Sequence, residues 1–109
     1  MSDINTGDLE LGGNIVLSGF SEIDRGSMVI VKKMVGTFAK RISENMPDFE
    51  LLKVTVKPVH KGEDMPAKKF ELKVQVIAGG KPYNSDVTDN NIFIVLDKAL
   101  KKVEVSMAK

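Results

Sequence analysis

The amino-acid sequence predicts a single α+β domain in which two helices cover one face of a four-stranded mixed sheet. Three observations lead to this prediction. Residues 28–46 repeat apolar side chains at helical spacing, the segments that follow alternate apolar and polar side chains, and residues 92–109 return to helical spacing. In chain order the elements are β-α-β-β-β-α, which is the pattern of a two-layer sandwich.

Residues 28–46 are the most clearly two-sided segment of the chain. At about 100° per residue, the apolar side of this helix consists of Val31, Met34, Val35, Phe38, Ile42 and Met46. The polar side consists of Lys32, Lys33, Gly36, Thr37, Lys40, Arg41, Ser43 and Glu44. Because burial of the apolar side contributes more than helix propensity, the helix needs a partner surface. The alternating segments indicate that this surface is a sheet.

The N-terminal part is expected to hold a tail and the first strand. We predict a flexible tail over residues 1–13, where only Leu9 and Leu11 alternate in a way that favours a weak extra strand. The domain then covers residues 14–109. Asn14 to Phe20 is an apolar run that is long enough for one strand. Three residues can cap the helix that follows: Ser21, Asp24 and Ser27.

Three more strands are predicted after the first helix. Residues 50–59 and 70–76 each alternate apolar and polar side chains, and a charged loop separates them. Gly79-Gly80 predicts a two-residue hairpin, so a fourth strand, residues 83–87, should run back beside the third. Pro82 cannot donate a ladder hydrogen bond, which marks this last strand as an edge of the sheet.

The second helix follows a run of cap residues at 88–91. Its apolar side consists of Ile92, Leu96, Ala99, Leu100, Val103 and Met107. The first two strands flank a helix, which predicts a parallel crossover, and the last three strands should form an antiparallel meander. One core is expected to contain Val31, Val35, Phe38, Ile42, Leu96, Leu100, Val103, Leu52, Val54, Leu72 and Val74. The open sheet face would carry Lys53, Thr55, Lys57, Glu71, Lys73 and Gln75.

Composition argues against most enzyme classes. The chain has 109 residues, of which 42% are hydrophobic and 28% charged, as in an ordinary globular domain. It has no cysteine and one histidine, which excludes disulfides, thiolate metal sites and a cysteine nucleophile. We therefore expect a non-enzymatic protein without catalytic residues, metal or cofactor. The acidic, polar N-terminus and the lack of a long apolar run predict a cytoplasmic protein that does not bind membranes.

The net charge of +1 is distributed unevenly along the chain. Residues 1–27 carry a net charge of −4, whereas residues 28–109 carry +5. The candidate RNA-binding residues lie on the polar sides of both helices: Lys33, Lys40, Arg41, Lys98, Lys101 and Lys102. Two cationic ridges, with Gly36 and Thr37 lowering the surface, are suited to the phosphates of structured RNA. Ordinary solvent-exposed helix faces explain the same lysines without RNA.

The order of elements and the C-terminal residues resemble the ribosome hibernation-promoting factor and ribosome-associated inhibitor family. Residues 91–100, NIFIVLDKAL, look like the start of that family's second helix, in which a polar residue precedes an apolar-aromatic pair. The Gly79-Gly80 hairpin and the glycine-ended first strand also fit. The resemblance implies a fold distantly like double-stranded-RNA-binding domains, whose basic helices meet ribosomal RNA and block translation.

The predicted function is therefore binding of ribosomal or other structured RNA through the basic faces of both helices. Recognition should depend on shape and phosphates, because the open sheet face carries no aromatic residue for base stacking. The alternative is a protein-interaction module or homodimer. In that case the unpaired edge at Tyr83 to Val87 would add to another sheet.

Overall fold

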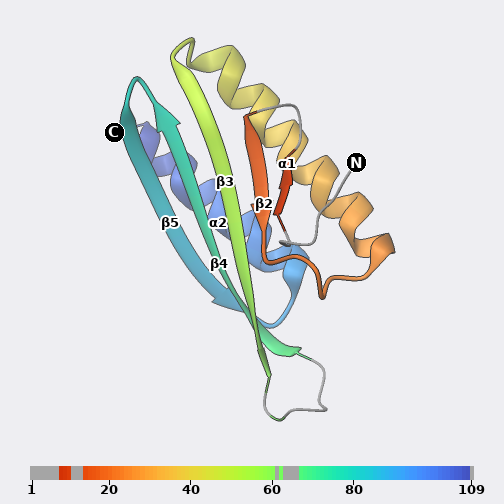
Figure 1. Ribbon diagram of the computed structural model, residues 1–109. Coiled ribbons are helices and arrows are strands. Elements are labelled where there is room, and N and C mark those ends of the chain that lie inside the picture. The colour runs from red at the N-terminus through yellow and green to blue at the C-terminus, as the bar shows by residue number, and fades with distance from the viewer. Residues whose placement is uncertain (1–7, 11–13, 61, 63–66, 109) are drawn as a thin grey trace.

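The computed structural model describes residues 8–10, 14–60, 62 and 67–108. Its elements are β1 (Asp8–Glu10), β2 (Ile15–Ser18), α1 (Arg25–Asn45), β3 (Phe49–His60), β4 (Ala67–Ala78), β5 (Lys81–Asp89) and α2 (Ile92–Met107). From β2 to α2 they follow the predicted β-α-β-β-β-α order, and both helices pack on the sheet (Figure 1).

The sheet has the predicted mixed topology. Its strand order is β1-β2-β3-β4-β5, so the predicted fourth strand, now β5, lies at an edge. β2 runs parallel to β3, with Ile15 beside Leu52, and the remaining neighbours are antiparallel. The parallel crossover through α1 and the antiparallel meander are both confirmed.

The sheet also has a fifth strand in the region that the sequence assigned to a tail. Residues 8–10 form β1, which pairs antiparallel with β2 and places Leu9 opposite Leu17. The pairing gives hydrogen-bond partners to an edge of β2 that would otherwise be open. The weak extra strand considered at Leu9 is therefore present, and the four-strand count was one too low. Residues 1–7 and 11–13 of the predicted tail lie outside the described residues.

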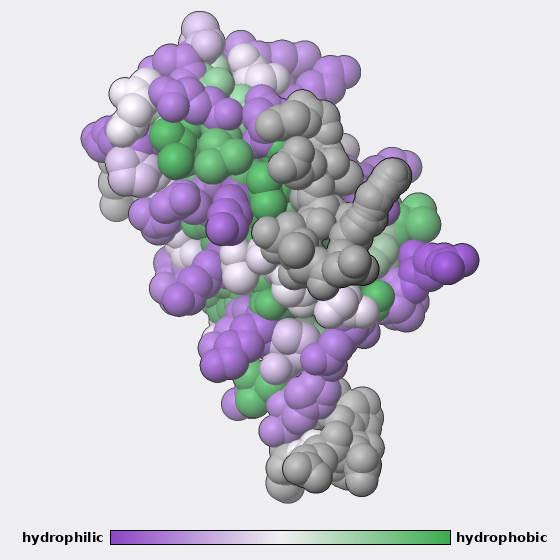
Figure 2. Space-filling model, in the orientation of Figure 1, coloured by the Kyte–Doolittle hydropathy of each residue, from purple (hydrophilic) through white to green (hydrophobic). Residues whose placement is uncertain are grey.

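The core lies between the sheet and the two helices. All eleven side chains predicted to share it are buried in one cluster, which the two helices and β2, β3 and β4 build together. On the opposite sheet face Lys53, Lys57, Glu71 and Lys73 are exposed, and Thr55 and Gln75 are partly exposed. Figure 2 shows a mainly hydrophilic surface with a hydrophobic patch in its upper part. Because the buried cluster lies on one face of the sheet and the exposed polar side chains on the other, both helices cover the same face.

Local contacts determine where α1 begins. Of the three candidate caps, Asp24 is used: its carboxylate accepts hydrogen bonds from the Ser27 backbone N–H at 3.0 Å and hydroxyl at 2.7 Å. The helix therefore begins at Arg25, which is one of the three starts that the sequence left open. Upstream, Gly19 has a φ of +82° and lies so close to the Val56 carbonyl that an added Cβ would overlap it.

The strands of the meander are longer than predicted. The ladder between β3 and β4 continues to His60, which pairs with Ala67, so the predicted loop over residues 60–69 is shorter. The Gly79-Gly80 hairpin is confirmed, with φ values of +60° and +74°, as a type I′ turn requires. Glu50 also accepts a hydrogen bond from the Gly80 N–H at 2.7 Å.

Candidate nucleic-acid interface

Positive charge is concentrated in the helix layer. The two helices together contain eight basic and three acidic residues, a net charge of +5. The five strands contain six basic and six acidic residues, a net charge of zero. The helices therefore attract an anionic partner more strongly than the strands as a whole, whose charges cancel.

Lys33 and Lys40 are the unpaired cations of the candidate set. Both side chains are exposed on α1, and within the described part of the chain neither has a hydrogen-bond or ion-pair partner. They are seven residues apart, which places them on the same side of the helix and about 10 Å apart along its axis. These two ammonium groups can meet an anion without first breaking a contact.

The surface between these two lysines is low. Gly36 and Thr37 lie between them on α1. A Cβ added at Gly36 would meet no atom within 4 Å, so no neighbouring group in the described structure fills the space over this glycine. The structure therefore leaves room for close approach of a partner's backbone at this point.

Arg41 forms an ion pair that connects the two helices. Its guanidinium donates to both carboxylate oxygens of Glu104 on α2, with Nε–Oε2 at 3.1 Å and Nη2–Oε1 at 2.9 Å. These hydrogen bonds raise the pKa of Arg41 above its usual value. The guanidinium also lies over Phe38, 5.5 Å from the ring centroid. Arg41 thus links α1 to α2 and shares its charge with an acid.

The three lysines of α2 also have partners. Lys98 pairs with Asp89 at 3.0 Å, and Lys101 pairs with Asp97 at 3.0 Å. Lys102 donates to the backbone carbonyl of Asp86 at 3.1 Å. Lys98 and Lys102 therefore bond to residues of β5, whereas Lys101 lies beside α1. The six predicted residues do not form one continuous patch, because Lys98 and Lys102 are bound to β5, at the edge of the sheet.

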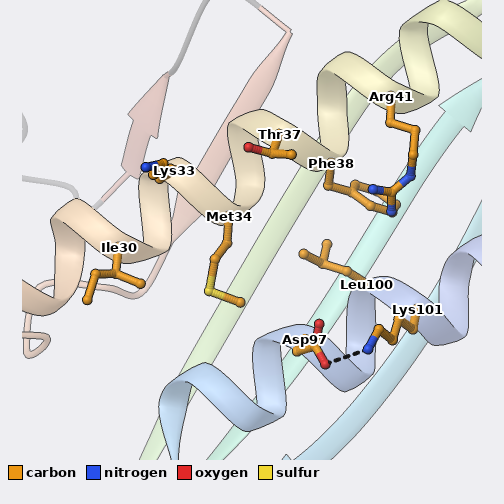
Figure 3. A pocket seen from close by; sticks show the side chains of 9 residues that line it. All are labelled: Ile30, Lys33, Met34, Thr37, Phe38, Arg41, Asp97, Leu100 and Lys101. Carbon is orange, nitrogen blue, oxygen red and sulfur yellow. Dashed lines mark ion pairs between the residues drawn. The ribbon is translucent and has the colours of Figure 1, made fainter.

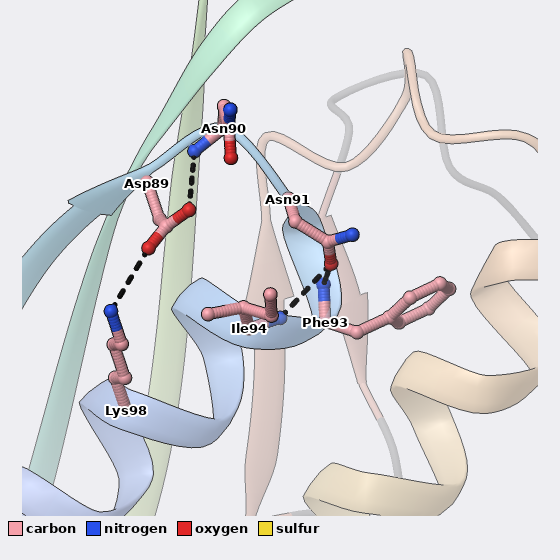
Figure 4. A network of polar contacts seen from close by, with 6 residues as sticks. All are labelled: Asp89, Asn90, Asn91, Phe93, Ile94 and Lys98. Carbon is pink, nitrogen blue, oxygen red and sulfur yellow. Dashed lines mark hydrogen bonds and ion pairs between the residues drawn. The ribbon is translucent and has the colours of Figure 1, made fainter.

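Hydrogen bonds connect the start of α2 to the end of β5, and Lys98 takes part in one of them (Figure 4). Asn91 caps the helix, and its side-chain oxygen accepts from the backbone N–H groups of Phe93 at 2.9 Å and Ile94 at 3.1 Å. The Lys98 ammonium and the Asn90 N–H both donate to Asp89, and they lower the pKa of that carboxyl. The end of β5 and the first turns of α2 are thereby connected.

A groove lies between the two helices (Figure 3). Its volume is about 380 Å³, and its lining consists of Ile30, Lys33, Met34, Thr37, Phe38, Arg41, Asp97, Leu100 and Lys101. Met34, Phe38 and Leu100 point toward one another and form an apolar floor. Three of the predicted RNA-binding residues, Lys33, Arg41 and Lys101, lie around it.

Sequence patterns alone did not identify this groove. Ile30 is 48% exposed and Val29 is 68% exposed, although both are large and apolar. Both residues lie outside the apolar arc of the first helix. Two adjacent aliphatic residues on a solvent-facing side indicate a contact site, so this part of the groove could have been predicted from the sequence. The sequence does not show that α2 supplies the second wall.

Neither the protein-family models nor the curated proteins include a match to this chain. The resemblance to ribosome hibernation factors therefore stays a prediction. Among the described residues, no three acidic or histidine side chains are grouped closely enough to hold a metal ion. No helix of the described chain is long and apolar enough to cross a membrane.

Proposed function

We propose that this chain is a non-enzymatic, cytoplasmic protein that binds ribosomal or other structured RNA through its helix layer. The distribution of charge carries the proposal, since the helices have a net charge of +5 and the strands have none. Ribosome association and control of translation are the roles that the resemblance to hibernation factors implies. The binding mode is recognition of backbone phosphates, because phosphate contacts dominate the affinity of proteins for nucleic acids.

Lys33 and Lys40 make the first phosphate contacts in this proposal, because neither has to leave an internal partner. Arg41 and Lys101 add to the surface by exchanging their carboxylates for phosphates. Ion pairs on an exposed surface contribute about 0–1 kcal/mol, so such an exchange costs little. Lys98 and Lys102 contribute long-range attraction from the β5 side of α2.

Co-sedimentation with small ribosomal subunits tests the proposal. The protein should pellet with the subunits at low salt and progressively less as salt increases, since each phosphate contact releases condensed counterions. Subunits and the purified ribosomal RNA should be compared, to separate binding of RNA from binding of ribosomal proteins. Absence of the protein from both pellets at low salt would overturn the proposed function.

A second candidate function is association through β5. The observation that favours it is the position of this nine-residue strand at a sheet edge. In an antiparallel hairpin alternate residues bond to the neighbour, so the backbone groups of residues 82, 84, 86 and 88 face outward. Pro82 has no N–H, and Lys102 already bonds to the Asp86 carbonyl. These two features oppose strand addition, and RNA binding is therefore the first proposal.

Sedimentation over a range of concentrations tests this second candidate. Asn84→Pro removes an outward-facing N–H and leaves the backbone hydrogen bonds to β4 in place, and of the side-chain bonds to β4 it removes the one that Gln75 donates to Asn84 at 3.2 Å. This variant is a better probe than a charge at Tyr83, because Tyr83 packs against the core. A concentration-dependent dimer that Asn84→Pro abolishes would support the edge mechanism. A monomer at all concentrations would exclude a homodimer.

A further inference from the structure

The groove between α1 and α2 combines an apolar floor with a cationic rim. Met34, Phe38 and Leu100 form the floor, and Ile30 lies at one end with about half of its surface exposed. Lys33 stands on the α1 side and Lys101 on the α2 side. Binding of phosphates is sufficient to explain the cations of the rim. Phosphate contacts leave the exposed side chain of Ile30 and the partly exposed side chain of Met34 without a partner, while Phe38 and Leu100 are buried beneath them.

A regular RNA duplex does not match this combination. Its outer surface presents phosphates and 2′-hydroxyl groups, and its bases are stacked inside. Such a surface would cover Ile30 and Met34 with polar groups and would provide no apolar contact in return. An RNA with a base outside the helix presents both chemistries together, because the apolar faces of that base lie within reach of its own phosphates.

We propose that the groove binds one nucleobase extruded from a bulge or loop of a structured RNA, while Lys33 and Lys101 contact the phosphates on either side. This inference rests on the proposed function and specifies its RNA class. A volume of about 380 Å³ lies within the range of small-ligand pockets. The apolar floor covers the base, and the exposed guanidinium of Arg41 offers a flat stacking surface.

Polar groups of the groove can then contact the edge of the base. The carboxylate of Asp97 pairs with Lys101 at 3.0 Å, and it can accept hydrogen bonds from a base when Lys101 leaves it for a phosphate. The hydroxyl of Thr37 can donate or accept hydrogen bonds. Asp97 would repel a phosphate but suits an amino group such as N6 of adenine or N4 of cytosine. Its presence among the cations of the rim is therefore consistent with contact to a base.

Two RNA hairpins test the inference. Both have a stem of about 16 base pairs, the length that a double-stranded-RNA domain spans, and one carries a single bulged adenosine. The protein should bind the bulged hairpin about 5- to 10-fold more tightly, at the lower end of the range for base stacking on proteins. Replacing the bulged adenosine by fluorescent 2-aminopurine should report a change in its environment on binding.

Matched variants assign the effect to the groove. Ile30→Ser should abolish the preference for the bulge and leave binding to the regular hairpin unchanged, because it removes apolar surface but no charge. Val29→Ser is the control: Val29 is more exposed, at 68%, and does not line the groove. Retention of the preference in Val29→Ser and its loss in Ile30→Ser would support the inference.

Other outcomes separate the inference from the proposed function. Equal, salt-dependent binding of the two hairpins would overturn the base-binding groove and leave phosphate recognition standing. Equal losses of the preference in Ile30→Ser and Val29→Ser would also overturn it, because the effect would not belong to the groove. Binding to neither hairpin nor to ribosomal subunits would overturn both proposals.

Discussion

Replacing Phe38 by alanine removes the side chain at which the core, the groove and the link between the helices meet. The ring is 2% exposed, and it lies beneath the Arg41 guanidinium at 5.5 Å. Loss of a buried phenyl group and the cavity left behind should lower the free energy of unfolding by about 3–5 kcal/mol. A small domain has a total stability of about 5–15 kcal/mol, so the variant would lose a large part of it.

Urea denaturation followed by circular dichroism measures this loss. Thermal denaturation gives a second measurement. A loss of 1 kcal/mol lowers the Tm by about 4–8 °C, so Phe38→Ala should melt at least about 12 °C below the wild type. Val29→Ala is the control, because Val29 is 68% exposed and its truncation should change stability by no more than about 0.5 kcal/mol. A loss below about 1 kcal/mol for Phe38→Ala would contradict the position of Phe38 in the core.

Three further predictions concern the helix layer. Gly36→Ala should stabilise the protein by about 0.5–1 kcal/mol in urea denaturation, because the added Cβ meets no atom within 4 Å and alanine favours the helix. Glu104→Gln should tighten RNA binding by up to about 5-fold, because Arg41 no longer has to leave a carboxylate before it contacts a phosphate, and weaker binding in a filter assay would refute this. Hydrogen bonds lower the pKa values of Asp24 and Asp89, so their contribution to stability is present above about pH 4 and is lost as pH falls further. Urea denaturation of Asp24→Asn/Asp89→Asn between about pH 5 and pH 2 should accordingly show a weaker pH dependence than the wild type.

Period-two alternation and helical spacing were sufficient to predict the domain from β2 to α2. Leu52, Val54 and Val56 on one strand and Leu72, Val74 and Val76 on the next specify which sheet face is buried. The apolar arc from Val31 to Ile42 then requires that α1 cover that face. Long elements with a strong pattern were therefore placed correctly.

Short elements and boundaries depend on contacts that the local sequence does not contain. β1 has three residues, and its formation depends on an open edge of β2. The start of α1 was ambiguous because Ser21, Asp24 and Ser27 all have the chemistry of a cap. Only the hydrogen bonds between Asp24 and Ser27 show which residue is used.

The candidate interface was the hardest part to predict. Helical spacing showed which lysines are exposed but not which are already paired. Arg41 and Glu104 are 63 positions apart in the chain, so their ion pair follows from the packing of α1 on α2. The groove has the same origin, because its two walls come from different helices. The sequence places Lys33 and Lys40 near the centre of the first ridge, and the structure adds that these two have no partner among the described residues whereas the other four cations do.

The salt dependence of RNA binding in two double variants tests the central claim most directly. With about four phosphate contacts, the plot of log K against log salt should have a slope of about −3 to −4 for the wild type. Lys33→Gln/Lys40→Gln should weaken binding to small ribosomal subunits and flatten the slope by about 1–2 units. Lys53→Gln/Lys73→Gln removes the same charge from exposed positions on the open sheet face and should change the slope little. Equal losses in the two double variants would contradict binding through the helix layer and would indicate a general effect of net charge.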